Sequence, residues 1–422
     1  MEAPEVKVLP GDVARLRELA RQVRETAESP KNQECLRLWR QHDIAGERPL
    51  FLVETDGGFP MVLPDYVPQC QEPWAQGQEQ GLVATLLHAH NIGDDYPIEP
   101  WINIGWRLAI SGYGVEQKVT RPDTSGALGA YHIEPPISDL AKEVGRLQPR
   151  TYAVDREATM REHALLSDVF AGILGVRIRH NPWWTLGLTW TAISLIGLEN
   201  LMLYMYDEPE PLHHLMAFLR DDNLALVGWM EREGLLCANN ENDYVGSGSR
   251  GYTSRLPQPD WRPGSPLRSR DLWTLIESQE TVGVGPDLYA EFIFPYENAI
   301  AACFGGVYYG CCEPVHTRWD VLKGLANLQR VSVSPWCDEA FMAEALGTQY
   351  VYSRKPNPTL VSTEVFDEDV IRADVRHTLR LTKAFGNSVE VIMKDVHTLH
   401  GEPDRLTRWV RLAREVADEV YG

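Results

Sequence analysis

The stretch Arg330-Val-Ser-Val-Ser334, a helical segment at 338–346 and the stretch Tyr350-Val-Tyr-Ser353 decide the fold. Short β-branched and aromatic runs that alternate with helical segments predict strand–helix units in a parallel sheet. The alternation continues on both sides, with a strand at 307–309, helices at 319–327 and 367–385, a strand at 389–393 and a last helix capped by Asp404. Four successive units of this kind predict an α/β fold. We expect one (β/α)8 TIM barrel.

The N-terminal residues predict a helical extension ahead of the barrel. An amphipathic helix that Asp12 can cap, with Leu16, Leu19 and Val23 on one face, is followed by a second short helix at 34–41. The first buried strand follows at 49–53. We therefore expect a helical extension at 1–48 and a barrel at 49–422, because no linker-like stretch divides the rest.

Composition and charge exclude several classes of partner. The 422 residues carry 60 acidic and 40 basic side chains, a net charge of -20, which disfavours nucleic acid and anionic lipid. The most apolar stretch, 185–205, is interrupted by Glu199 and Asn200, so we predict a buried helix and no membrane span. Seven cysteines and no visible secretory signal lead us to expect a reducing cytoplasm with free thiols.

Thiol and other polar side chains follow four of the predicted strands. They are Cys311, Cys312, Glu313 and His316 after the first, Trp336, Cys337 and Asp338 after the second, Lys355 and Asn357 after the third, and Lys394, Asp395 and His397 after the fourth. Since the carboxyl ends of parallel strands meet at one edge, we expect these side chains to share a rim. The alternative for the cysteines is a buried structural pair.

Two other segments have competing interpretations. Glu277 and Glu280, at the end of an apolar run, are candidates for proton transfer or support, or else form the solvated start of a helix. The segment 246–251 matches a dinucleotide-binding fingerprint in letters only, because no helix follows it. We predict a flexible loop there that can cover the barrel mouth.

Several segments in order resemble the uroporphyrinogen decarboxylase-like superfamily, and in detail its bacterial uroporphyrinogen-III decarboxylase-like branch. They are Asp95-Tyr-Pro-Ile-Glu-Pro-Trp101 (which contains Glu99), Asn239-Asn240, Glu277-Ser-Gln-Glu280, Tyr309-Gly-Cys-Cys-Glu-Pro314, Ser332-Val-Ser-Pro-Trp-Cys-Asp338, Lys355-Pro-Asn-Pro358 and Met393-Lys-Asp395. The resemblance implies a β/α barrel from about residue 49 onward. It also implies a pocket at the strand ends, and homodimers are common among such proteins.

The zinc methyltransferases of this superfamily, which act with corrinoid proteins, suggest one function. Their His-x-Cys pair corresponds to Tyr309-Gly310-Cys311 here, so tyrosine replaces a histidine ligand. The resemblance leaves Cys311, Cys337 and His397 as a zinc set, a chemically suitable combination. We expect a methyltransferase-type enzyme for a small methylated compound. Cobalamin would come on a separate corrinoid protein.

The decarboxylase branch supplies the alternative, a cofactor-free carboxy-lyase acting on a small carboxylated ring. The family's arginine-rich stretch is missing, and Glu54 and Asp56 follow the first strand instead, so a highly anionic tetrapyrrole is disfavoured. A non-catalytic binding protein is a third possibility. The candidate catalytic residues are Tyr309, Glu277, Glu280, Asp338, Lys355 and Lys394. The candidate substrate-binding residues are Glu99, Asn240, Cys312, Glu313, His316, Trp336, Asn357 and Asp395.

Overall fold

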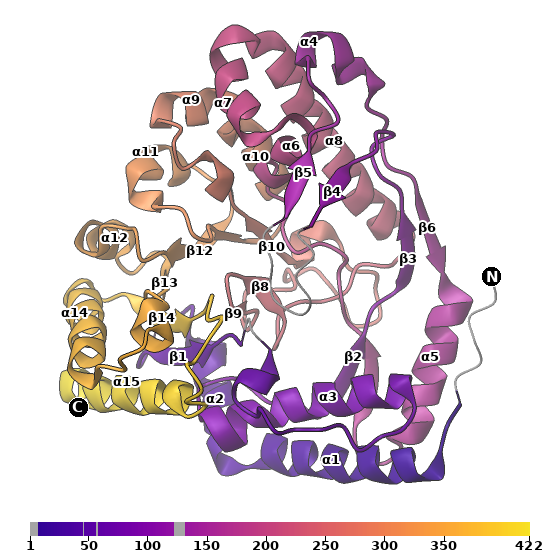
Figure 1. Ribbon diagram of the computed structural model, residues 1–422, viewed down its shortest axis with the longest axis vertical. Helices are drawn as coiled ribbons and strands as arrows, with labels where there is room; N and C mark the ends of the chain where they lie inside the picture. The colour runs from indigo at the N-terminus through magenta and orange to yellow at the C-terminus, as the bar shows by residue number, and fades with distance from the viewer. Residues whose placement is uncertain (1–6, 45, 56–57, 122–130) are drawn as a thin grey trace.

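A six-stranded parallel sheet organises the C-terminal half of the chain (Figure 1). The structure is a computed structural model that describes residues 7–44, 46–55, 58–121 and 131–422; Asp56 lies outside this part. The strand order is β1-β14-β13-β12-β11-β10. The strands are β1 (Leu50–Val53), β10 (Trp273–Ile276), β11 (Gly306–Tyr309), β12 (Leu328–Val333), β13 (Val351–Arg354) and β14 (Ser388–Met393).

The remaining strands form separate pairs. β2 (Trp101–Ile104) pairs in parallel with β7 (Gly175–Ile178). Three antiparallel pairs are β3 (Arg107–Ile110) with β6 (Tyr152–Asp155), β4 (Lys118–Thr120) with β5 (His132–Glu134), and β8 (Tyr244–Gly246) with β9 (Ser249–Arg250). The expected α/β class with a parallel sheet is therefore confirmed. Among the described residues, however, the ladder has two open edges, β1 and β10, and an eight-stranded closed ladder is not present.

Prolines account for these open edges in part. Single backbone hydrogen bonds join Asp95 to Phe51 of β1 and Leu186 to Leu275 of β10, where further ladders would run. Pro97 and Pro100 precede β2, and Pro182 follows β7. Because proline has no N–H donor, these segments cannot sustain a regular ladder.

Helices cover the outer face of the sheet and extend along the N-terminal half (Figure 1). They are α1 (Pro10–Glu28), α2 (Pro30–Gln41), α3 (Pro73–Leu87), α4 (Leu140–Glu143), α5 (Arg156–Val169), α6 (Thr189–Ile196), α7 (Leu198–Asp207), α8 (Pro209–Arg232), α9 (Pro286–Phe292), α10 (Phe294–Ala301), α11 (Trp319–Leu322), α12 (Glu339–Leu346), α13 (Thr359–Ser362), α14 (Glu368–Phe385) and α15 (Arg405–Tyr421). The helix expected at 319–327 stops at Leu322. The segment 185–205 contains α6 and the start of α7, separated by Gly197.

One expected helix cap is wrong, and the other is confirmed in position but makes no capping hydrogen bond. Asp12 lies inside the first turn of α1, where its carboxylate accepts hydrogen bonds from the backbone N–H groups of Gln71 and Glu72. Asp404 occupies the N-cap position of α15 without a capping hydrogen bond from its side chain. Aspartate is a typical N-cap residue, but the Asp12 carboxylate instead fixes the loop before α3.

The two faces of the sheet differ in chemistry. Val331, Val333, Val389 and Val391 point into the apolar core beneath the helices. Alternate positions on the same strands, including Arg330, are polar and buried. The hairpin β8–β9 covers this polar inner face, and its residue Gly246 lies so close to Tyr308 that a Cβ would be 2.3 Å from the ring. The segment 246–251, expected to be a flexible loop, is therefore part of a buried hairpin that packs against the inner face of the sheet.

Candidate active site

The expected rim residues directly follow the sheet strands at their carboxyl ends. Gly310 makes the sharp turn after β11, with φ +95, and a Cβ there would lie 3.2 Å from the side chain of Ser332. Only glycine adopts such a conformation without strain. The turn brings Cys311 and Cys312 beside Lys394, which directly follows β14.

The two thiols and one lysine form the centre of the site. Cys311 Sγ lies 3.6 Å from Cys312 Sγ and 3.8 Å from Lys394 Nζ, and Ser247 Oγ of the hairpin is 3.9 Å away. The hydrogen bond from Cys312 lowers the pKa of Cys311 to about 7 against the effect of burial, and the Lys394 charge acts in the same direction. Cys311 is therefore substantially a thiolate at neutral pH, the form that acts as a nucleophile.

Cys312 and Lys394 both stabilise the negative charge of Cys311. The hydrogen bond to Cys311 raises the pKa of Cys312, which remains a thiol. Although burial opposes it, the negative charge of Cys311 raises the pKa of Lys394. Asp395 lies 3.5 Å from Lys394 Nζ and 3.8 Å from Cys312 Sγ. In space, the Cys312 thiol, the Cys311 thiolate and the Lys394 ammonium group therefore lie next to one another.

Lys355 lies deeper, on the polar inner face. Its Nζ atom donates hydrogen bonds to Tyr308 Oη at 2.8 Å and Ser353 Oγ at 2.6 Å. Burial lowers the pKa of Lys355 to about 7, although the nearby Glu390 opposes this shift. An amine with this pKa can exchange a proton at neutral pH.

The predicted acids form a second buried group beneath the thiols. Glu313 accepts hydrogen bonds from the backbone N–H groups of Cys311 at 2.8 Å and Ser278 at 3.1 Å, so it positions the Cys-Cys turn. Burial, followed by the charge of Glu280, raises the pKa of Glu277 to about 10. Burial also raises the pKa of Glu280, whose side chain accepts a hydrogen bond from Thr189. Glu277 is consequently a protonated acid at neutral pH.

Tyr309 points away from the thiols. Its hydroxyl contacts Ser278 Oγ at 2.8 Å and Tyr289 Oη at 3.1 Å, and Tyr289 in turn donates to Glu297. The adjacent Tyr308 faces the interior and contacts Lys355. Because neighbouring residues on a strand face opposite sides, Tyr308 is the tyrosine that sequence analysis missed. A catalytic role for Tyr309 remains a prediction.

Cys312 and Trp336 line an open cavity of about 530 Å³, together with Glu280 and Pro314. Trp336 is 66% exposed, so its indole can contact a small molecule. Cys311 itself is 5% exposed, just behind Cys312. The cavity therefore gives a ligand access to Cys312, the neighbour of Cys311.

Three other candidates have local structural roles, and a fourth is exposed. Asp338 caps α12 by accepting from the Phe341 N–H, and its own N–H donates to His316 Nδ1 at 3.3 Å. Asn357 caps the short turn before α13 through the Thr359 N–H. His397 is exposed on the loop after β14. These contacts leave the predicted binding and catalytic roles of these residues without geometric support.

The expected zinc ligands are not gathered around one point. Cys311 Sγ faces Cys312, Lys394 and Ser247, whereas Cys337 Sγ contacts Ser334 Oγ at 3.6 Å and the Glu313 carbonyl at 3.9 Å. In residues 7–44, 46–55, 58–121 and 131–422, no group of three His, Cys, Asp or Glu side chains is arranged to hold a metal ion. The donor set therefore does not fit zinc in this arrangement, and the zinc site remains a prediction.

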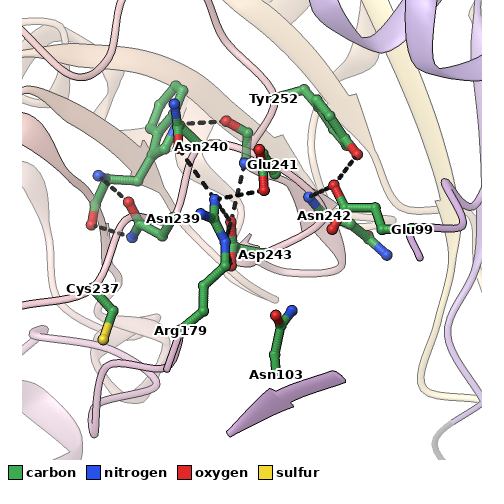
Figure 2. A network of polar contacts seen from close by, with 12 residues as sticks. Glu99, Asn103, Arg179, Cys237, Asn239, Asn240, Glu241, Asn242, Asp243 and Tyr252 are labelled. Carbon is green, nitrogen blue, oxygen red and sulfur yellow. Dashed lines mark hydrogen bonds and ion pairs between the residues drawn. The ribbon is translucent and has the colours of Figure 1, made fainter. Parts of the chain in front are cut away.

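Glu99 and Asn240 belong to a separate polar network, shown in Figure 2. Arg179, which follows β7, donates to Asn240 Oδ1 at 3.2 Å and to Asp243 at 2.7 Å. Glu99 accepts a hydrogen bond of 2.5 Å from the Tyr252 hydroxyl. Arg179 and Asp243 of this network line a cavity together with Tyr244 of the hairpin.

Sequence analysis also missed Tyr244 and Ser247 on the hairpin. Burial raises the pKa of Tyr244, and the charges of Lys394 and Cys311 act on its hydroxyl as well. A glycine-flanked Ser247 on a buried turn, where Gly246 and Gly248 allow close approach, was the available signal. This signal could be interpreted only with the knowledge that the segment packs against the inner face of the sheet.

Comparisons with known proteins identify no family for this chain. No protein-family model matches the chain, and no curated protein matches it. Among solved structures, a methyltransferase from Methanosarcina mazei is similar with a TM-score of 0.49 and 10% identity, covering 93% of this chain and 99% of that chain. In the described part of the chain, every helix is too short or too polar to span a bilayer.

Proposed function

We propose that this chain is a methyltransferase-type enzyme for a small methylated compound, with Cys311 as the residue that first accepts the methyl group. The observation that carries the proposal is the Cys311–Lys394 pair, in which a sulfur with a pKa of about 7 lies 3.8 Å from an ammonium group. Thiolates attack saturated carbon readily, and a stabilising cation keeps the thiolate populated.

The reaction is a displacement at the methyl carbon. The Cys311 sulfur forms a bond to carbon, and the bond between carbon and its nitrogen, oxygen or sulfur atom breaks with the electron pair leaving on that atom. Lys394 supplies a proton when the leaving group is an anion. The cavity at Cys312 and Trp336 is one proposed entry for a methylated compound.

Other parts of the proposal come from the sequence resemblance. A separate corrinoid protein would take the methyl group from Cys311 and regenerate the thiolate. Membership of the uroporphyrinogen decarboxylase-like superfamily would make β2 and β7 members of an eight-stranded barrel, as the single hydrogen bonds from Asp95 and Leu186 support. No step is assigned to zinc.

Mass spectrometry of the intact protein and its peptides tests the proposal. We expect incubation with a reactive methylated compound to add one methyl group to the peptide that contains Cys311. Cys311→Ser should abolish this product. Cys303→Ser should leave it unchanged, because this thiol lies just ahead of β11, at the opposite end of the strand from Cys311. Turnover of a methylated substrate by Cys311→Ser at the wild-type rate would contradict the proposal.

One observation favours the lyase alternative. Lys394 supplies a cation at the rim, and Lys355, with its pKa of about 7, can act as a proton donor or acceptor nearby. A carboxylate held by Lys394 would lose carbon dioxide, and Lys355 would protonate the resulting carbanion. This reaction predicts carbon dioxide release that survives Cys311→Ser, chelators and removal of cobalamin.

A further inference from the structure

A second cavity, of about 590 Å³, lies between β2, β7, β10 and the hairpin strand β8. Its wall includes Trp183, Trp184 and Tyr244. Trp184 is 49% exposed and Tyr244 is 38% exposed, and the indole N–H of Trp184 donates to the Tyr244 hydroxyl at 3.1 Å. The hydrogen bond joins the two side chains, so they form one aromatic wall of the cavity. We call this space the aromatic cavity.

The charged side chains of the aromatic cavity are already neutralised. Arg179 donates to Asp243 at 2.7 Å and lies 3.3 Å from Glu241. Figure 2 shows these three side chains converging beside Asn103, which extends from β2. An anionic ligand would have to displace Asp243 or Glu241 from the guanidinium. A cation meets no unbalanced positive charge from this network.

Exposed aromatic faces in such a cavity favour a particular kind of cation. The quadrupole of tryptophan and tyrosine attracts cations, above all those with little hydration such as quaternary ammonium groups.

The hairpin connects the aromatic cavity to the thiols. Tyr244 at one end of the hairpin lines the cavity, and Ser247 at its turn contacts Cys311 Sγ at 3.9 Å. We propose that the aromatic cavity binds a small quaternary ammonium compound. Its role as the substrate site rests on the proposed function, whereas binding itself does not.

A quaternary ammonium compound suits methyl transfer to Cys311. The thiolate forms a sulfur–carbon bond, the carbon–nitrogen bond breaks, and nitrogen keeps the electron pair. The negative sulfur and the positive nitrogen both become neutral, so the products are a methyl thioether and a tertiary amine. No proton has to be supplied, in contrast to an alcohol or thiol leaving group.

Calorimetric titration tests the binding with choline and with its uncharged isostere 3,3-dimethyl-1-butanol. We expect choline to bind at least roughly tenfold more tightly, a ratio that corresponds to about 1.4 kcal/mol. Trp184→Leu and Tyr244→Leu should each remove most of this preference. Trp190→Leu is the matched control, because Trp190 is 42% exposed on α6 and does not line the cavity. Equal binding of the two compounds, or an unchanged preference in Trp184→Leu, would overturn the inference.

The fate of Cys311 separates this inference from the proposed function. Methyl tosylate, an uncharged methyl donor, should methylate Cys311 in both the wild type and Trp184→Leu. Binding of choline without methylation of Cys311 by any donor would contradict the proposed function and leave the cation site standing. Methylation by methyl tosylate with no preference for choline would do the reverse.

Discussion

Lys394 Nζ lies 3.8 Å from Cys311 Sγ, at the carboxyl ends of two strands that β12 and β13 separate in the sheet. Two loops that are distant in the sequence therefore meet to stabilise one thiolate. The contact joins an ammonium group and a sulfur that are both largely shielded from water, where electrostatic attraction is stronger than at the surface.

Replacing this lysine should weaken the thiolate. In Lys394→Met, we expect the pKa of Cys311 to rise from about 7 towards the ordinary cysteine value of about 8.5, because burial is no longer opposed by the ammonium charge. The measurement is the pH dependence of the rate at which iodoacetamide alkylates Cys311, read by peptide mass spectrometry. Lys323→Met, on an exposed lysine, should leave the profile unchanged. An unchanged profile in Lys394→Met would show that Cys312 alone sets the pKa.

Lys355 should make stability depend on pH. Its pKa is about 7 in the folded protein and about 10.4 in an unfolded chain, so between these values the unfolded chain binds more protons and this residue makes stability rise with pH. Below pH 7 both states are protonated and the full penalty of burying the charge remains.

Lys355→Met should remove that contribution. Relative to the variant, the wild type should gain up to about 1.4 kcal/mol of unfolding free energy per pH unit between pH 7 and 10. Urea denaturation at several pH values measures the difference, and Lys323→Met again serves as the control. Parallel stability curves for the wild type and Lys355→Met would mean that Lys355 is not desolvated.

Arg330 should hold the hairpin in place. Its fully buried guanidinium donates to Ser249 Oγ at 2.8 Å, to the Arg250 carbonyl at 2.5 Å and to the Tyr252 carbonyl at 2.7 Å. Arg330→Met leaves these buried acceptors without their donor and removes one cation beside the buried Glu390, which we expect to destabilise the protein by about 3–5 kcal/mol.

Limited proteolysis should then find new cleavage sites within 244–253. The control is Arg376→Met, which breaks a partly exposed ion pair with Glu419 and should change stability by less than about 1 kcal/mol. A protease-resistant hairpin in a destabilised but folded Arg330→Met would show that the hairpin is held by its other contacts.

Two glycine substitutions should act in opposite directions. Gly310→Ala places a Cβ at φ +95 within 3.2 Å of Ser332, so we expect a loss of about 1–3 kcal/mol and slower alkylation of the displaced Cys311. Gly77→Ala, inside α3 with no atom within 4 Å of the new Cβ, should stabilise the protein by about 0.5–1 kcal/mol. Thermal unfolding compares them, and equal effects would contradict the strain at Gly310.

The parts of the fold that sequence analysis predicted have strong local periodicity. α15 buries Leu406, Trp409, Val410, Ala413 and Val416, the face expected from their spacing. The strand at 389–393 is part of β14. The central part of the chain was not predictable in this way, because β2, β7 and the hairpin strands are short and lie beside proline and glycine residues.

The sequence by itself determined that a parallel sheet would bring thiols, lysines and acids to one edge, because strand–helix alternation fixes which loop follows each strand. Only the tertiary structure decided which of them meet. Cys311 faces Cys312, Lys394 and Ser247, whereas Cys337 and Asp338 serve their own loop. The reason is physical: side-chain direction at a strand end depends on turn geometry and on what covers the sheet, and here the covering element is a hairpin distant in sequence from both loops.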